Sequence, residues 1–337
     1  MFRVVIDAMG GDFGVQSTVA GAANVSLESE NIQMTLVGNA PAITEALGSV
    51  SHDARRIQVA HSSPSSHSTS PSEDAEARAS IDAAMELLAR GGADALVSAG
   101  QTDSLVAAAT ARLQHLPGIQ RAALAAVHPT EQRHGPKDDP FALLLDVGAT
   151  QEASAEDLVN FAVMGSAYAK IISSNPRPTV ALLSNGNEPH RGTTAIRQAH
   201  EHLSCHRAVH FVGNVEGLDL PRGSVDVVVC DGFTGSVVFA MLEGVTDVVT
   251  DLAKDAYARK FLWRLGLTML SQGLRQLRVM TDWRQYGGAP LLGFESVIIK
   301  AHGRSNTRAI RNAIRVATKA IEHDLSGQIR MGLMPTK

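Results

Sequence analysis

Short aliphatic runs alternate with amphipathic stretches along almost the whole chain. The runs are rich in Val, Ile and Leu, which is typical of strands buried on both faces of a parallel sheet. They lie at residues 3–6, 33–38, 94–99, 122–127, 141–146, 179–183, 209–212, 225–229 and 296–300. The segments 15–27, 75–90 and 154–172 between them have helical spacing. This alternation predicts an α/β fold with a doubly wound, mostly parallel sheet, formed by one domain over residues 1–337.

The stretch Val225–Ser236, with the sequence VDVVVCDGFTGS, is central to this prediction. Gly232 and Gly235 flank Thr234, so the backbone can turn sharply and leave several N–H groups unpaired. The apolar run 237–242 then continues as a helix. A strand, a Gly-rich turn and a helix N-terminus together make a binding site for an anion. Open α/β sheets bind their ligands at such carboxyl ends of strands.

Four other strands end in similar polar or Gly-rich turns. In chain order these turns contain Gly10, Gly11 and Asp12; Gly100 and Thr102; Asn185 and Gly186; and Asn214. Their repetition predicts one crevice lined by backbone donors, hydroxyls and amides. Asp7 and Asp12 either position donors there or are ordinary turn and cap residues. No GxGxxG, P-loop, GxSxG or HExxH motif is present in the sequence.

Two helices, at 237–252 and 257–277, predict a helical hairpin over residues 237–280 that extends from the domain. The second helix is amphipathic and carries basic residues away from its apolar face. Such a helix packs in a core or a dimer, or presents a basic surface to an acidic partner or an anionic lipid. The Ser- and Pro-rich segment 61–74 and the Gly-rich segment 286–293 are expected to be loops.

Composition narrows the classes of function. The 337 residues carry a formal charge of −4, which argues against a dedicated nucleic-acid binder. Cys205 and Cys230 cannot form a disulfide framework or a zinc site by themselves, and a reducing compartment fits them best. We see no signal peptide and no uncharged apolar run of the roughly 18 residues that a membrane span needs. We therefore expect a cytoplasmic protein that at most touches the inner face of the membrane peripherally.

A covalent mechanism is not required by these residues. Cys230 ends a valine-rich strand, where a buried thiol is more common than a nucleophile. The remaining groups suit the binding and positioning of a phosphate, without a metal or a cofactor.

Several phrases of the chain resemble the PlsX family of bacterial phosphate acyltransferases, collinearly over nearly its whole length. They are IDAMGGD (6–12), VSAG (97–100), LLDVGA (144–149), FAVMGSAYA (161–169), GNVEG (213–217), VVVCDGFTG (227–235), YGGAPLLG (286–293) and NAIRVA (312–317). The resemblance implies a Rossmann-like fold similar to isocitrate and isopropylmalate dehydrogenases. It implies reversible transfer of a fatty acyl group from acyl carrier protein to inorganic phosphate, which gives acyl phosphate for phospholipid synthesis. It also implies a homodimer, with a membrane acyltransferase as a further partner.

This reaction requires a held nucleophile and a stabilised oxyanion, because the thiolate is already a good leaving group. We expect Asp12, Asp231 and Thr234 to act in catalysis, the two carboxylates by orienting donors. We expect the phosphate or the oxyanion to bind at Gly10, Gly11, Gly100, Thr102, Asn185, Gly186, Asn214, Gly232, Gly235 and Ser236. Arg259, Lys260 and Arg264 are expected to contact the acidic carrier protein.

The chain departs from the family pattern at several turns. Gln101 and Asp103 stand where the family has Asn and Gly, and Thr150 stands where it has Asn. Asn187 replaces a Glu, and Leu218 replaces a basic residue. Two alternatives therefore stay open: a diverged acyltransferase that uses acyl-CoA or another acceptor, and a non-catalytic scaffold that binds acyl carrier protein. A hydride-transferring dehydrogenase of similar fold is disfavoured by the missing dinucleotide motif.

Overall fold

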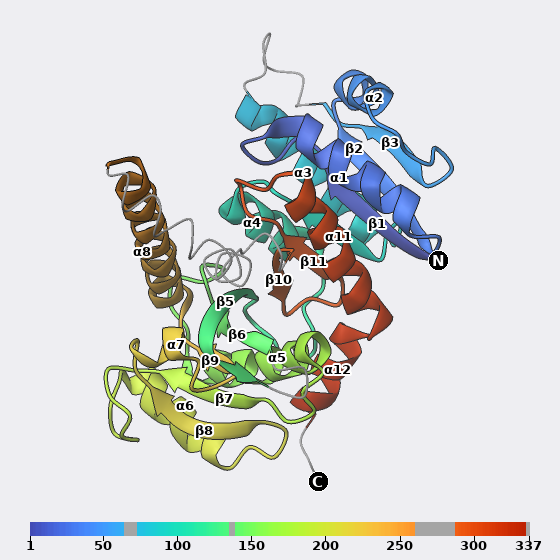
Figure 1. Ribbon diagram of the computed structural model, residues 1–337. Helices are drawn as coiled ribbons and strands as arrows, with labels where there is room; N and C mark the ends of the chain where they lie inside the picture. Colours follow the sequence, from blue (N-terminus) through green and yellow to red (C-terminus); the bar gives the residue numbers. More distant parts are fainter. Residues whose placement is uncertain (64–72, 135–138, 260–286, 335–337) are drawn as a thin grey trace.

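A computed structural model describes residues 1–63, 73–134, 139–259 and 287–334 (Figure 1). Within these residues, eleven strands form one sheet in the order β3-β2-β1-β4-β11-β10-β5-β6-β9-β7-β8. The strands are β1 Phe2–Asp7, β2 Ile32–Gly38, β3 Ile57–His61, β4 Ala95–Ser98, β5 Ala123–His134, β6 Asp139–Leu145, β7 Thr179–Leu183, β8 His210–Val215, β9 Val227–Val229, β10 Ala289–Leu292 and β11 Val297–Lys300. The helices are α1 Gly14–Glu28, α2 Ala40–Gly48, α3 Glu73–Ala89, α4 Thr102–Arg112, α5 Ala155–Ser173, α6 Thr194–Ser204, α7 Asp219–Arg222, α8 Gly232–Arg259, α11 Thr307–Glu322 and α12 Leu325–Leu333.

The sheet consists of two parallel blocks joined by an antiparallel centre. Strands β3, β2, β1, β4 and β11 form the first block, and β6, β9, β7 and β8 form the second. Between them, β11 pairs antiparallel with β10, β10 with β5, and β5 with β6. Three reversals make the two blocks run in opposite directions. The expected mostly parallel, open α/β sheet is confirmed, but its two sets of carboxyl ends do not share one edge.

Strand alternation explains how helices cover the first block on both faces. In β1, Val4 and Ile6 pack in a cluster with α1, α2 and α11, whereas Val5 between them packs with α3 and α4. All three side chains are at most 1% exposed. This two-sided burial is why the strands of the block have continuous aliphatic sequences rather than alternating ones.

The second block is covered in the same way. The side chains of β6, β7 and β9 that face α5, α6 and α12 form one cluster, around Phe161 and Tyr168 of α5. Those on the opposite face pack with α7 and with the first turns of α8, where Phe239 and Leu242 lie. Beyond these turns α8 projects from the body of the protein (Figure 1). Helix α5 begins at a capping box formed by Ser154 and Asp157, as the sequence predicts.

Several local predictions need correction. Residues 289–292 are strand β10 rather than loop, because their backbone pairs with both β5 and β11. Strand β3 was not expected from the sequence. Helix α8 continues without a break past residue 252 to Arg259, and the rest of the expected hairpin lies outside the described residues. Most of the expected loop at 61–74 lies outside them as well, although His61 belongs to β3.

The segment Gly232–Leu252 of α8 is long and apolar enough to cross a membrane, by length and composition only. The sequence predicts no uncharged apolar run of this length, and Glu243 and Asp247 lie within the segment. Only 11% of this window is buried inside the structure. Both acidic side chains contact the body of the protein, as described below, so the beginning of α8 is part of the α/β fold.

Candidate functional site

A polar cavity of about 820 Å³ lies at the carboxyl ends of β1, β4 and β11. Five of the expected site residues line it together: Gly10, Gly11, Asp12, Gly100 and Thr102. They come from turns that are about 90 residues apart in the sequence and adjacent in the sheet, because β1 pairs directly with β4. This part of the predicted crevice is therefore assembled as the alternation of strands and turns suggests.

The buried carboxylate of Asp7 holds the two turns together. It accepts hydrogen bonds from Ser80 Oγ at 2.5 Å, from Ser98 Oγ at 2.6 Å and from the Met9 N–H at 3.1 Å. Burial raises the pKa of Asp7, and these hydrogen bonds oppose the shift. A Cβ atom on Gly10 would lie 2.4 Å from the Gly100 nitrogen, so the two turns meet this closely only with glycine. Asp7 thus positions backbone and hydroxyl groups, one of the two roles considered for it.

Two helices direct their N-termini at this cavity. Phe13, Gly14 and Val15 at the start of α1 line it, and so do Gln101, Thr102 and Ser104 at the start of α4. Within the described part of the chain, neither N-cap residue, Phe13 or Gln101, makes a side-chain capping hydrogen bond. The first N–H groups of a helix have no partner in the helix itself and carry a partial positive charge. Their convergence makes the cavity suited to an anion.

Lys300 is the residue that sequence reasoning missed. It ends β11, lies only 8% exposed, and donates a hydrogen bond from Nζ to the Ala301 carbonyl at 2.5 Å. Burial lowers its pKa to about 8, while the carboxylates of Asp7 and Asp12 act in the opposite direction. The available signal was a lysine at the end of an otherwise aliphatic strand, VIIK. A charged side chain is almost never fully buried unless it is paired.

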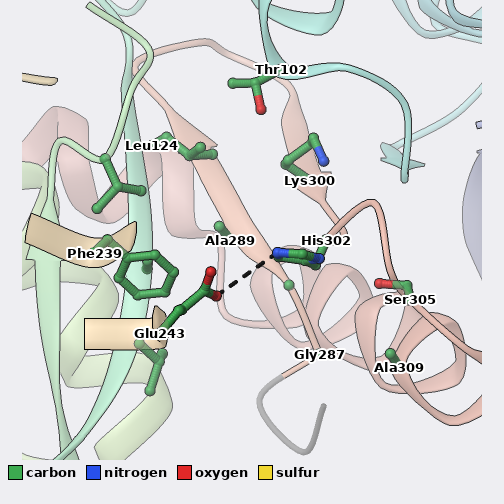
Figure 2. A pocket seen from close by; sticks show the side chains of 14 residues that line it. Thr102, Leu124, Phe239, Glu243, Gly287, Ala289, Lys300, His302, Ser305 and Ala309 are labelled. Atoms are coloured by element: carbon green, nitrogen blue, oxygen red, sulfur yellow. Dashed lines mark ion pairs between the residues drawn. The ribbon is translucent and has the colours of Figure 1, made fainter. Parts of the chain in front are cut away.

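A smaller pocket of about 190 Å³ adjoins the cavity and shares Thr102 and Lys300 with it (Figure 2). Its other walls are mainly apolar and come from the antiparallel centre of the sheet, from the turn after β6 and from α8: Leu124, Ala126, Val127, Ala289, Val147 and Phe239. Figure 2 shows Lys300 and Thr102 on one side of this space and Phe239 on the other. The polar cavity and the mainly apolar pocket therefore adjoin at Lys300 and Thr102.

An ion pair lies beside this pocket. His302 Nε2 is 3.8 Å from Glu243 Oε1, which joins the turn after β11 to α8. The Arg304 N–H donates to His302 Nδ1 at 3.0 Å, so Nε2 is the ring nitrogen that faces Glu243. Arg304 Nη1 lies 3.8 Å from Asp247 Oδ2, one turn further along α8.

The Gly-rich turn at the start of α8 differs from the expected anion site. The Gly232 N–H donates to Thr150 Oγ1, the Thr234 N–H to Asp231 Oδ1, and the Gly235 N–H to the Asp231 carbonyl. Thr234 Oγ1 also donates to Asp231 Oδ2, at 2.7 Å. These groups were expected to be unpaired, and that expectation is wrong, because they cap and close the helix.

The two glycines of this turn permit close packing. A Cβ on Gly235 would lie 1.8 Å from the Asp146 carbonyl oxygen, and one on Gly232 would lie 2.2 Å from that of Thr150. Asp146 is buried and accepts hydrogen bonds from five groups: the N–H groups of Leu124, Gly148, Ala149 and Thr150, and Thr150 Oγ1. Burial raises the pKa of Asp146, and these hydrogen bonds oppose the shift. Ser236 lies beside Gly148 at the edge of the same turn.

The remaining expected residues form a third group at the ends of β7 and β8. Asn185 Oδ1 accepts the Gly192 N–H at 3.0 Å, and Asn214 Nδ2 donates to the Glu188 carbonyl at 3.0 Å. His200 Nδ1 lies 2.9 Å from Asn214 Oδ1. Gly186 packs against Glu188 and Arg191. Among the described residues, none of this group lines the polar cavity or the apolar pocket, so the structure divides the expected crevice into separate places.

The other expected residues have simpler outcomes. Cys230 is buried, and burial raises the pKa of its thiol, which agrees with a packing role. Asp103 is not among the described residues that line the polar cavity, although its neighbours on both sides are. Arg259 is the last described residue of α8, and the expected contacts Lys260 and Arg264 lie outside the described residues.

The fold is similar to that of solved phosphotransacylases. A phosphotransacetylase from Streptococcus pyogenes matches with a TM-score of 0.64 at 17% identity, over 95% of this chain and 94% of that one. A branched-chain phosphotransacylase from Enterococcus faecalis matches with a TM-score of 0.56 at 16% identity, over 96% of this chain and 100% of that one. At these identities the likeness defines the fold class, an open α/β sheet of the phosphotransacylase type.

The chain belongs to the family described as "Fatty acid synthesis protein", whose model matches residues 2–328. It is 36% identical to a phosphate acyltransferase from Aliarcobacter butzleri over 340 residues, which cover 99% of this chain and 98% of that relative. A phosphate acyltransferase from Thermoanaerobacter pseudethanolicus is 34% identical over 331 residues, 97% of this chain and 96% of the relative. These matches confirm the resemblance to the PlsX family and the expected enzyme class, an acyltransferase.

Proposed function

We propose that this protein transfers a fatty acyl group from the thioester of acyl carrier protein to inorganic phosphate. A phosphate oxygen attacks the thioester carbonyl carbon, the carbon–sulfur bond breaks, and the carrier leaves as a thiolate that takes a proton from solvent. The products are acyl phosphate and the free carrier. The observation that carries the proposal is the convergence of two helix N-termini and buried Lys300 on one polar cavity that opens into an apolar pocket.

The phosphate occupies the polar cavity in this proposal. The N-termini of α1 and α4 supply fixed dipoles, and Lys300 supplies a full positive charge at the junction with the pocket. Thr102 offers a hydroxyl at the same junction. Gly10, Gly11 and Gly100 allow the phosphate to approach the backbone, since no Cβ stands in the way. Asp12 lies at the start of α1, where its carboxylate orients donors around the phosphate.

Lys300 and Thr102 also stand where charge develops. When phosphate attacks, the thioester oxygen becomes an oxyanion, and donors already fixed in place stabilise it without reorganisation. A buried cation acts strongly here, because the surrounding medium screens its charge less than water does. The roles of Asp231, Thr234, Asn185, Gly186, Asn214, Gly232, Gly235 and Ser236 in binding phosphate stay predictions without support from their observed contacts.

The biological setting is part of the same proposal. Acyl phosphate would serve phospholipid synthesis in the cytoplasm, beside a membrane acyltransferase that consumes it. A homodimer is supported by the exposed apolar side chains of α8, among them Met241, Val248 and Leu252. Arg259, Lys260 and Arg264 would meet the acidic carrier protein, or an anionic lipid surface.

The test is acyl-phosphate formation from two donors. The protein is incubated with phosphate and either palmitoyl-loaded acyl carrier protein or palmitoyl-CoA, and the product is trapped with hydroxylamine as the hydroxamate. We expect product from the carrier protein. Product from acyl-CoA alone would show that acyl-CoA is the donor in place of the carrier protein. Equal product from both would show that the protein does not prefer the carrier. Absence of product from either, with the carrier still bound, would leave a scaffold and overturn the proposal.

A further inference from the structure

A second hollow continues the apolar pocket towards the outside of the protein. It has a volume of about 310 Å³ and runs along α8, where Leu242, Val245 and Thr246 line it, opposite Pro129 of β5. The pocket and this outer groove share Val127, Phe239, Glu243 and His302. The two spaces therefore adjoin at these residues, and together, as the path, they extend from Lys300 to the exposed side of α8.

The polarity of this path changes along its length. Its inner end has the Lys300 ammonium and the Thr102 hydroxyl, whereas Leu124, Ala126 and Val147 of the same pocket offer no polar side-chain atoms. His128 lines the outer groove, and burial lowers its pKa to about 4, so its ring is neutral there at ordinary pH.

Apart from Lys300, the charged groups described along the path occur as pairs at its waist and mouth. His302 and Glu243 stand where the pocket meets the outer groove, and Arg304 and Asp247 line the outer groove further along α8. A molecule that fits has an anionic or strongly polar head, an apolar body and little else. A nucleotide or a sugar would need several polar partners along the path, whereas His302 and Glu243 at its waist already contact each other.

We propose that the alkyl chain of the acyl substrate lies along this path, with its carbonyl at Lys300 and Thr102 and its far carbons in the outer groove beside Val245. The inference rests on the proposed function and adds the binding site and the basis of chain-length selection. The inner pocket alone, at about 190 Å³, has about six times the roughly 30 Å³ that a water molecule takes in the liquid. This volume is enough for a short alkyl segment, so only longer chains pass Phe239 into the outer groove.

The test measures binding of alkyl phosphonates, which do not depend on catalysis. Butyl, octyl and dodecyl phosphonate are titrated into the full chain by calorimetry, below the concentration at which the dodecyl compound forms micelles. One fully buried methylene changes affinity by about fourfold. Since burial along the path is partial, we expect roughly tenfold from butyl to octyl and about tenfold again from octyl to dodecyl.

The variant Val245→Glu places a charge in the outer groove only. Val245 is 53% exposed, so the substitution leaves the core untouched. We expect it to remove the gain from octyl to dodecyl while butyl binds as before. The matched control is Val249→Glu, the same change one turn further along α8 at a position 61% exposed that is not among the described lining residues. The control should keep both gains.

The outcomes separate this inference from the proposed function. If the protein forms acyl phosphate but dodecyl binds no more tightly than octyl, or if both variants lose the gain equally, the path is not the chain site and the function stands. If dodecyl binding depends on Val245 alone and no donor gives acyl phosphate, the alkyl site stands and the proposed function falls.

Discussion

The two parallel blocks of the sheet use the same local design for different purposes. In each, an aspartate stands at the end of a buried strand or directly after it, and a turn that contains glycine follows. Asp7 does this in the first block, and Asp146, with the Gly-rich turn of α8 packed on it, does it in the second. In the first block the helix N-termini face a cavity, whereas in the second the turn is closed by its own hydrogen bonds.

The difference lies in which partners the aspartate takes. Asp7 binds hydroxyls from other elements, Ser80 and Ser98, and so draws separate turns around an open space. Asp146 accepts mainly from the N–H groups of Gly148, Ala149 and Thr150 in its own turn, and the start of α8 packs against that closed turn. A strand followed by Gly-rich residues therefore indicates either an anion site or a packed joint, and tertiary contacts decide which.

The largest expected effect comes from removing the cation of the open block. Lys300→Met should lower kcat/KM for acyl-phosphate formation by about 10² to 10³, the usual loss when one fixed donor to an oxyanion is removed. The control is Lys254→Met, which removes a lysine of α8 that pairs with Asp251 at the surface. The measurement is the hydroxamate assay over a range of phosphate concentrations. Equal activity in the two variants would exclude Lys300 from the site.

The closed block should respond to an added methyl group with a loss of stability. Gly235→Ala places a Cβ 1.8 Å from the Asp146 carbonyl oxygen, and we expect the free energy of unfolding to fall by about 3 kcal/mol. Gly244→Ala in the same helix has nothing within 4 Å and should be neutral or more stable, by up to about 1 kcal/mol. Urea denaturation followed by circular dichroism compares the pair. A Gly235→Ala protein as stable as Gly244→Ala would contradict the packed joint.

The pH dependence of activity tests the charge at the open block. The pKa of Lys300 is lowered to about 8, so the cation is present below this pH and is lost above it. We expect kcat/KM to fall by about tenfold per pH unit above 8, since each unit removes a further tenfold of the charged form. The Lys300→Arg variant should stay charged above pH 8, so its kcat/KM should not fall in this way. A fall near pH 8 that persists in the arginine variant would assign it to another group.

The same lysine makes a prediction for stability with the opposite sign. Its pKa in the folded protein lies below the ordinary value of 10.5, so the unfolded chain binds more protons between about pH 8 and 10.5. The contribution of Lys300 to stability therefore improves as pH rises through this window, because the cost of burying its charge disappears. Comparison with Lys300→Met by urea denaturation at pH 7 and pH 9 isolates this contribution, and a difference that does not change with pH would contradict it.

The sequence predicted what depends on local pattern. Aliphatic runs located most strands, and the Gly-rich turns after β1 and β4 identified five of the residues that line the open site. It did not predict β10, because its residues follow Gly287 and Gly288 and contain Pro290, which suggests a loop until pairing with β5 and β11 supplies partners. The reversal of the second block depends on that strand, so the expected single crevice could not be corrected from local pattern.

Individual roles depended on burial, which the sequence does not show. Lys300 looks like the polar end of a strand until the structure buries it between a polar cavity and an apolar pocket. Gly232 and Gly235 look like anion ligands until Thr150 and Asp231 take their N–H groups. In both cases the missing information is which element lies opposite, and that is set by pairings between distant segments.

The smallest expected effect concerns Asp103, where the open block departs from the family pattern. Its carboxylate lies in the first turn of α4, where a negative charge interacts favourably with the helix dipole. That charge competes with a bound phosphate for the same dipole, although Asp103 itself is not among the described lining residues. Asp103→Asn should therefore lower the KM for phosphate by about two- to fivefold, the equivalent of 0.3–1 kcal/mol for one charge at a helix end. The gain should shrink as salt is added, because exposed charges are screened. An unchanged or raised KM at low salt would mean that the phosphate does not bind at the N-terminus of α4, and the open block would lose one of its two helix dipoles.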